Sequence, residues 1–299
     1  MFFRNLSFMR FPTSLDFSGL AELLPNVALK PVGSLEMSSR GFISPFGNEH
    51  LLVERADVIL LSIGTEEKIL PAAVVNAELG KRLAEIEEKE GRRPGGRERK
   101  RLKDDLLHEL LPKALVRPGR VNALIFPELG LLAVDTSSRK AAEAVASDIR
   151  GALGSFPAMP INAEVAPRSV LTGWIAGEPV PYALSLGEEA ELRDPVEGGA
   201  IVKARHQELR CDEIDKHLDA GKQVTRLAMT LEDHLSFVIG EDLVVRKLKF
   251  LDGALDELED ADAEDRSAEL DARLALMAGE LKRLFFVLEQ VFKLSSVEG

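Results

Sequence analysis

The feature that most constrains the fold is a Gly- and Pro-rich break between two amphipathic helical patterns. In the first pattern, which begins after Pro71, apolar residues recur three or four positions apart as far as Ile86. The segment EGRRPGG at 90–96 ends it, because Pro and paired glycines are costly inside a helix. A second leucine stripe then covers about 97–115. The two helices therefore form a hairpin, and arms of ~20 residues, about 30 Å long, can project from a compact body.

Composition excludes several classes of protein. At ~150 residues per domain, the 299 residues suggest about two domains, enough to bury a core without a metal or a disulfide. The single cysteine, Cys211, excludes an internal disulfide and a Cys-rich zinc site. No apolar run approaches the ~20 residues that span a bilayer, and residues 1–10 lack the core of a signal peptide. We expect a cytoplasmic protein with no cofactor and no metal site.

The charge is distributed unevenly along the chain. The net charge is −12, which taken as an average argues against binding to nucleic acid. However, residues 89–103 contain eight basic and two acidic residues, a net charge of +6. Residues 251–272 contain ten acidic residues and one Arg, a net charge of −9. An acidic block near one end can therefore hide a basic surface elsewhere.

Short strands and helices alternate over the rest of the chain. Strand patterns lie within 1–11, 51–63 (one or two strands), 121–127, 130–135, 183–186, 200–206, 222–230, 234–239 and 243–250. Helical patterns lie at 138–153, 168–176 and 212–220, and the connector 157–167 holds one short strand. This order predicts an α+β fold with mixed or antiparallel sheets, a projecting helical hairpin and a long C-terminal helix.

That last helix, over about 263–294, is the most regular element. Its apolar residues step by alternating fours and threes and form a heptad seam: Leu270, Leu274, Met277, Leu281, Leu284, Leu288 and Val291. The seam favours a helix packed on its own domain, and a coiled coil that forms a dimer is the alternative.

Three domains follow from these elements. We expect a central α+β domain from 1–70 and 118–166, a hairpin tip domain over 71–117, and a base domain over 167–299 that holds a basic sheet and the C-terminal helix.

Three of the predicted strands each carry two basic residues at matching positions. Successive strand side chains point to opposite faces, so residues two or four apart share a face. The pairs are Lys203 with Arg205, Lys222 with Arg226, and Lys247 with Lys249. If these three strands belong to one sheet, that sheet has a basic face, and His206 and Gln207 add polar groups to it. Alternatively, these are edge-strand cations that discourage aggregation.

The hairpin turn offers a second basic surface. Arg92, Arg93 and Arg97 cluster at a Gly/Pro turn, and guanidinium groups bind phosphate oxygens bidentately. The alternative is a solvated helix surface whose arginines pair with nearby glutamates. One Trp and one Tyr leave few platforms for stacking single-stranded bases, whereas binding to the duplex backbone needs none.

Two other functional classes remain open. Asp57, Glu66 and Lys68 loosely resemble the two carboxylates and lysine of a metal-dependent nuclease. Alternatively, the acidic block 251–272 makes the chain a protein-interaction adaptor that binds a basic partner.

Several short motifs, in order and spacing, resemble RdgC, the bacterial recombination-associated protein family, along nearly the whole chain. They are EEKILP (66–71), LLPKAL (110–115), LGSFP (153–157), HQEL (206–209), AGKQVTRLAM (220–229) and RKLKF (246–250). None of them is a catalytic motif.

The resemblance implies a nucleoid-associated, non-enzymatic homodimer. Such a dimer closes into a ring at two interfaces, encircles double-stranded DNA without sequence preference, and binds single strands more weakly. It restrains RecA-mediated recombination and acts in replication fork repair. In the family the hairpin meets its partner through an apolar contact. The usual Phe of that contact matches Leu115, and Leu111, four residues before it, is the second residue expected there. In the family, a basic residue followed by Gln contacts DNA, and this pair matches His206 and Gln207. Because His is neutral at most physiological pH values, the charge at this position is weaker here.

Overall fold

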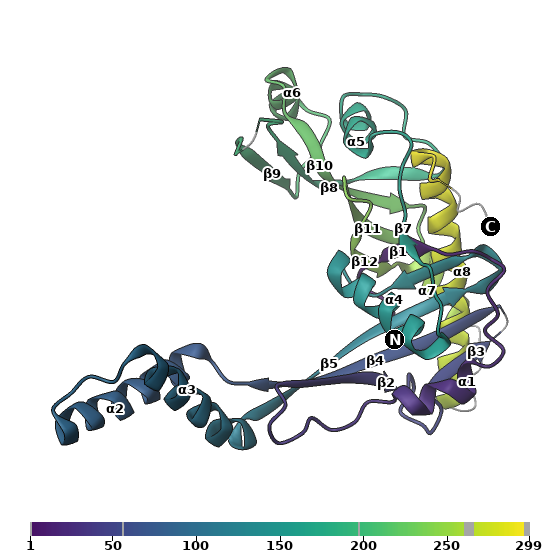
Figure 1. The fold of residues 1–299 in the computed structure, drawn as a ribbon. Helices are drawn as coiled ribbons and strands as arrows, with labels where there is room; N and C mark the ends of the chain where they lie inside the picture. Colours follow the sequence, from purple (N-terminus) through teal and green to yellow (C-terminus); the bar gives the residue numbers. More distant parts are fainter. Residues whose placement is uncertain (1, 56, 197, 260–265, 296–299) are drawn as a thin grey trace.

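Two antiparallel β-sheets, one of seven strands and one of five, organise the chain (Figure 1). The computed structural model describes residues 2–55, 57–196, 198–259 and 266–295. The predicted α+β fold with antiparallel sheets and a C-terminal helix is confirmed. Among the described residues, no helix is long and apolar enough to cross a membrane.

The seven-stranded sheet forms the centre of the molecule. In pairing order its path is β2 (Ser38–Ile43), β4 (Val58–Ile69), β5 (Leu115–Phe126), β6 (Leu131–Val134), β1 (Ser7–Arg10) and β7 (Met159–Pro160), and β3 (Leu52–Arg55) also pairs with β4. The run VILLSIG of β4 is buried because both faces of the sheet are covered there. The following TEEKI remains in the strand although it is polar, because it continues to pair with β5 outside the body.

The hairpin extends from the ends of β4 and β5. Its helices are α2 (Ala72–Glu90) and α3 (Gly96–Leu110). Pro71 precedes the first helix, and Gly91 ends it with a φ of 65°, a conformation that glycine adopts at little cost. Val75, Leu79 and Leu106 form a small core between the two arms. The predicted helical hairpin is confirmed.

The second arm ends earlier than the sequence predicts. The leucine stripe suggested a helix as far as residue 115, but α3 ends at Leu110 and a 3₁₀ turn, η2 (Leu111–Lys113), follows. Pro112 lies in that turn, and proline cannot continue a helix because it lacks the N–H donor. Leu115 is therefore the first residue of β5 and not part of the helix.

The five-stranded sheet forms the second lobe. Its order is β12 (Val245–Phe250), β11 (Leu235–Gly240), β10 (Gln223–Leu231), β8 (Leu184–Arg193) and β9 (Ile201–Arg205). The helices of this lobe are α5 (Pro167–Ile175) and α6 (Asp212–Asp219). The N-terminal segment joins the lobe to the central sheet, since Leu6 and Val245 exchange backbone hydrogen bonds of 2.8 and 3.0 Å.

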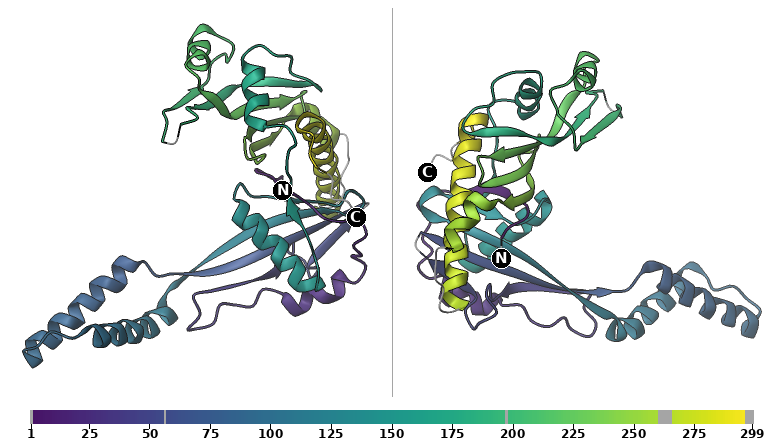
Figure 2. Two further views of the ribbon diagram at one scale, coloured as in Figure 1. Left: turned by 45° about the horizontal axis from the view of Figure 1, so that its top comes forward. Right: turned by 180° about the vertical axis from the view of Figure 1, so that it is seen from behind.

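The C-terminal helix α8 (Arg266–Phe292) packs along both sheets (Figure 2). Leu274, Leu281 and Leu284 of its heptad seam are 2% exposed or less, in one core with Leu60 of the central sheet and Phe237 of the second. The seam thus packs within its own chain, as the first of the two interpretations predicted. Residues 263–265 of the predicted helix, and 260–265 of the acidic block, lie outside the described residues.

The other face of the central sheet is covered by α4 (Arg139–Leu153) and α1 (Leu20–Leu23). Ser138 caps α4, because its Oγ accepts a hydrogen bond of 3.3 Å from the backbone N–H of Ala141. The predicted helix over 138–153 is therefore confirmed. The remaining elements are η1 (Leu24–Val27), η3 (Pro127–Leu129) and α7 (Asp252–Glu259).

Together these parts form a hook. The hairpin projects from the lower end of the body in Figure 1, and the β9 and α6 end of the second lobe projects from the upper end on the same side. Helix α8 lies on the outer side of the hook, away from the opening (Figures 1 and 2). The division into three domains stays a prediction.

Candidate nucleic-acid interface

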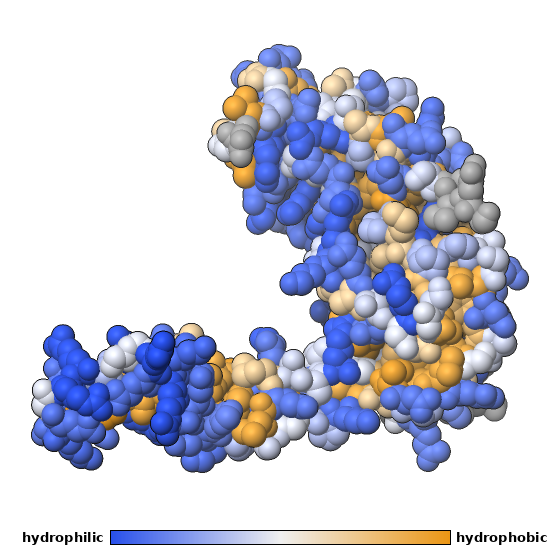
Figure 3. Space-filling model, viewed as in Figure 1, coloured by the Kyte–Doolittle hydropathy of each residue, from blue (hydrophilic) through white to orange (hydrophobic). Residues whose placement is uncertain are grey.

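The face of the second sheet opposite α8 is rich in charged side chains. Ala204 is buried between Lys203 and Arg205 on β9, so that both cations are exposed on the other side. In the same way, Leu248 is buried between Lys247 and Lys249 on β12. Both pairs share one face, as strand alternation predicts, and this face lies on the inner side of the hook, where Figure 3 shows a hydrophilic surface.

The third pair does not follow the alternation. Lys222 precedes β10 and lies in the turn after α6, where its backbone N–H donates to the carbonyl of His217 in that helix. A β-bulge between Val224 and Arg226 then shifts the register by one residue. Lys222 and Arg226 therefore do not share a strand face.

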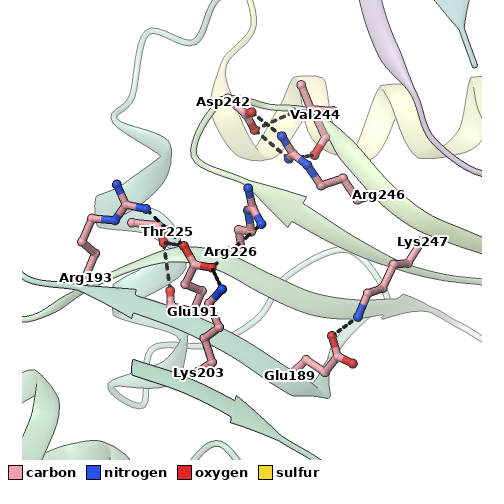
Figure 4. Close-up of polar contacts among 10 residues, drawn as sticks. All are labelled: Glu189, Glu191, Arg193, Lys203, Thr225, Arg226, Asp242, Val244, Arg246 and Lys247. Carbon is pink, nitrogen blue, oxygen red and sulfur yellow. Dashed lines mark hydrogen bonds and ion pairs between the residues drawn. The ribbon is translucent and has the colours of Figure 1, made fainter. Parts of the chain in front are cut away.

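Arg226 lies with the other cations in a hollow of about 300 Å³ (Figure 4). The residues that line it come from all five strands of the lobe and from the adjoining central body: Asn5, Ser137, Glu189, Ala190, Glu191, Lys203, Ala204, Arg205, Arg226, Val238, Arg246 and Lys247. Five of them are cationic and two are carboxylates, so the hollow carries a net positive charge. The other predicted contacts, Lys222, Lys249, His206 and Gln207, are not among its lining residues.

Carboxylates hold several of these cations in place. Lys247 Nζ donates a hydrogen bond of 2.5 Å to Glu189, and this bond holds the pKa of Glu189 below its ordinary value. Arg246 donates bonds of 2.9 and 2.5 Å to the two oxygens of Asp242. The basic groups are therefore fixed in position before any anion arrives.

His206 and Gln207 lie just beyond β9. His206 is exposed and has a φ of 55°, and Gln207 is half-buried. Both residues directly follow Arg205 in the chain, but neither lines the hollow.

At the hairpin turn the arginines pair with glutamates. Arg92 lies 2.7 Å from both Glu90 and Glu98, and Arg93 lies 2.8 Å from Glu87. The hydrogen bonds from Arg92 lower the pKa of Glu98. Such ion pairs are what the alternative of a solvated helix surface predicts. The side chains of Arg92, Arg93 and Arg97 nevertheless remain exposed. The hairpin arginines thus lie at the far end of one arm of the hook, and the strand cations lie in the second lobe, beside the central body.

Comparison with known proteins identifies the family. A family model described as "Putative exonuclease, RdgC" matches residues 1–295. The chain belongs to the RdgC family. It is 69% identical over 301 residues to the recombination-associated protein RdgC of Stenotrophomonas maltophilia (strain R551-3), and 65% identical over 302 residues to that of Xanthomonas campestris pv. campestris (strain B100). Both alignments cover 100% of each chain.

The two residues expected at a dimer contact of the hairpin differ in exposure. Leu115 is 76% exposed, and its partner across the strands, Ile69, is 45% exposed. Figure 3 shows an apolar patch where the hairpin joins the body. Leu111, by contrast, is only 5% exposed and packs within its own chain. A contact surface at the hairpin base can therefore use Leu115 but not Leu111.

The three residues of the nuclease alternative do not come together. Asp57 directly precedes β4 and Glu66 lies nine residues further along this extended strand, a separation of about 30 Å. Asp57 pairs with Lys282, while Lys68 is 6% exposed and donates to the Gly33 and Ser34 carbonyls. Two carboxylates so far apart cannot bind one ion, so this proposed site is wrong. Among the described residues, no group of three His, Cys, Asp or Glu side chains could hold a metal.

Sequence reasoning missed four charged residues of this face. Glu189, Glu191 and Arg193 alternate along β8, and that period of two was a visible signal. Arg246 had no such signal, because it enters the hollow through a bulge in β12 where Lys247 has a φ of 53°.

Proposed function

We propose that this protein binds double-stranded DNA through its phosphates, without sequence preference, as a ring formed by two copies. The observation that carries the proposal is the hollow with five cationic residues on the inner side of the hook. Cations that contact phosphates supply affinity but carry no sequence information.

Two surfaces at the ends of the hook support closure into a ring. At the lower end lies the apolar patch around Leu115 and Ile69. At the upper end β9 is the last strand of its sheet, and Ile201 on it is 49% exposed. An edge strand with free backbone groups favours pairing with a second chain. A second copy that contacts both ends encloses the basic inner face.

The resulting protein is not an enzyme but a physical barrier on the duplex. Its relatives are named for recombination. A ring around duplex DNA excludes other proteins from the occupied stretch, so the chain restrains RecA-driven strand exchange and acts at stalled replication forks on the nucleoid. It needs no cofactor, and single-stranded DNA binds more weakly.

Salt dependence on two unrelated duplexes tests this function. We expect equal affinity for both sequences and a linear fall of log K with log[salt], with a slope of about −0.9 for each phosphate neutralised. Lys203→Glu should weaken binding to both duplexes alike. Lys293→Glu is the matched control, because this exposed lysine follows the last residue of α8 on the outer side of the hook. A strong preference for one sequence, or equal effects of the two variants, would contradict the proposal.

Encirclement is tested separately with DNA topology. The protein is loaded on a plasmid at low salt and challenged with high salt, with the plasmid either closed or linearised. A ring remains on the closed circle and slides off the linear form. Equal loss from both forms would refute the ring while leaving phosphate binding intact.

A further inference from the structure

The Glu191 carboxylate lies at the point where the cations of the inner face converge. Its oxygens are 3.4 Å from Lys203 Nζ, 3.5 Å from an Arg193 nitrogen and 3.9 Å from an Arg226 nitrogen. Thr225 Oγ1 lies 3.3 Å from Glu191 Oε1. Figure 4 shows these side chains, which come from three neighbouring strands, directed toward the one carboxylate.

The carboxylate and its cations differ in their access to solvent. The Glu191 side chain is 11% exposed, whereas those of Lys203, Arg226 and Arg193 are 55%, 48% and 46% exposed. Burial by itself raises the pKa of Glu191, but Arg226 and Lys203 outweigh it, and the pKa lies below its ordinary value. Glu191 is therefore an ionised group beneath a rim of open cations.

Three cations share the Glu191 carboxylate, and none of them is bound to it closely. Nitrogen–oxygen distances of 3.4 to 3.9 Å are longer than strong charge-assisted hydrogen bonds, which are about 2.7–2.9 Å. Lys247, by comparison, donates a bond of 2.5 Å to Glu189 in the same hollow. The cations around Glu191 thus keep donor groups available, but their charge is partly neutralised.

We propose that Glu191 competes with the DNA phosphates for Lys203, Arg226 and Arg193, and so weakens the grip of the inner face on DNA. This inference rests on the DNA-binding function proposed above. A phosphate that approaches the rim must share cations that already have a counterion, so fewer solution counterions are released. The weaker contact suits a protein that moves along the duplex.

Glu191→Gln tests the inference, because glutamine keeps the size of the side chain and removes only its charge. One more effective phosphate contact for each protomer on DNA steepens the slope of log K against log[salt] by about 0.9. If the variant and the wild type bind equally at 1 M salt, the variant then binds roughly eightfold more tightly than the wild type at 0.1 M salt. Glu189→Gln provides a second test, since it frees Lys247 at a more exposed position, 29% exposed, and should act in the same direction.

The matched control is Glu188→Gln. Glu188 is exposed on the same strand and lines a different hollow, with Leu186 and Glu208. The control gives the same change in net charge, so it measures the effect of overall charge alone. We expect little change in affinity and an unchanged salt slope.

The outcomes separate this inference from the proposed function. Tighter binding and a steeper slope for Glu191→Gln than for Glu188→Gln support the competition, as does binding by Glu191→Gln when the wild type is too weak to detect. Equal or weaker binding by both Glu191→Gln and Glu189→Gln, with a wild type that still binds, would overturn the inference alone. If neither the wild type nor the variants bind DNA, the proposed function fails and the inference fails with it.

Discussion

Truncation of Leu281 tests how α8 holds the two lobes together. Leu281 is fully buried in the core that contains Leu60 of the central sheet and Phe237 of the second sheet. Leu281→Ala removes about three methylene equivalents, or ~2.4 kcal/mol of transfer free energy. A residual cavity adds to this, because two sheets enclose the site and cannot collapse onto it. We expect a loss of about 3–4 kcal/mol in the free energy of unfolding.

That loss should be visible as a shift in melting temperature. An unfolding entropy of about 2.1 cal/mol/K per residue over 299 residues converts 3–4 kcal/mol into roughly 5–6 °C. The assay is calorimetry with urea unfolding at low protein concentration. Phe286→Ala is the control, since this side chain of the same helix is 45% exposed and should cost much less. If Leu281→Ala weakened self-association and left the melting temperature unchanged, the seam would be a dimer contact and the reasoning would fail.

Three further predictions concern a helix cap, an ion pair and the hairpin patch. Ser138→Ala removes the acceptor for the Ala141 N–H and should lower the free energy of unfolding by about 1 kcal/mol, measured by urea unfolding; no change would contradict the capping role. Burial raises the pKa of Asp242, but the hydrogen bond and charge of Arg246 outweigh burial, and the pKa lies below its ordinary value. The pair therefore stabilises the fold fully above the ordinary pKa of Asp, and this stabilisation is lost as the pH falls below that value. The difference in urea midpoint between the wild type and Asp242→Asn should therefore narrow from pH 6 to pH 3, and a constant difference would show that the charge is irrelevant. Leu115→Asp should weaken self-association at least tenfold in sedimentation experiments without lowering the melting temperature of the dilute protein, because the side chain is 76% exposed; unchanged association would exclude this patch from the dimer.

Local patterns in the sequence predicted much of the architecture. The break at 90–96 and the stripes on either side fixed the hairpin, since helix periodicity and the cost of Pro and Gly act within a few residues. The helical pattern at 138–153 located α4 for the same reason, and in the structure Ser138 caps this helix and Gly154 ends it. The alternation of Lys203 and Arg205 around Ala204 located one part of the basic face correctly.

The errors arose where neighbouring strands impose the geometry. A bulge beside Thr225 separated Lys222 from Arg226, and another brought Arg246 into the hollow. A bulge is an extra residue relative to a partner strand, so one strand's own sequence cannot reveal it. Leu111 and Leu115 differ in the same way, because burial depends on what covers each residue.

By itself, the sequence determined most of the helices and strands, although it missed β2 and extended the second hairpin helix to residue 115. It also showed that basic residues are separated from the acidic C-terminal block. Local propensity and charge are properties of the chain alone. Only the tertiary structure decided that cations from separate strands share a hollow, that Glu191 neutralises part of it, and that the heptad seam packs inside one chain. These depend on contacts between residues far apart in sequence, whose distances are set by packing of the two sheets and α8. A net charge of −12 describes the sum of all residues, whereas binding responds to the charges gathered on one surface.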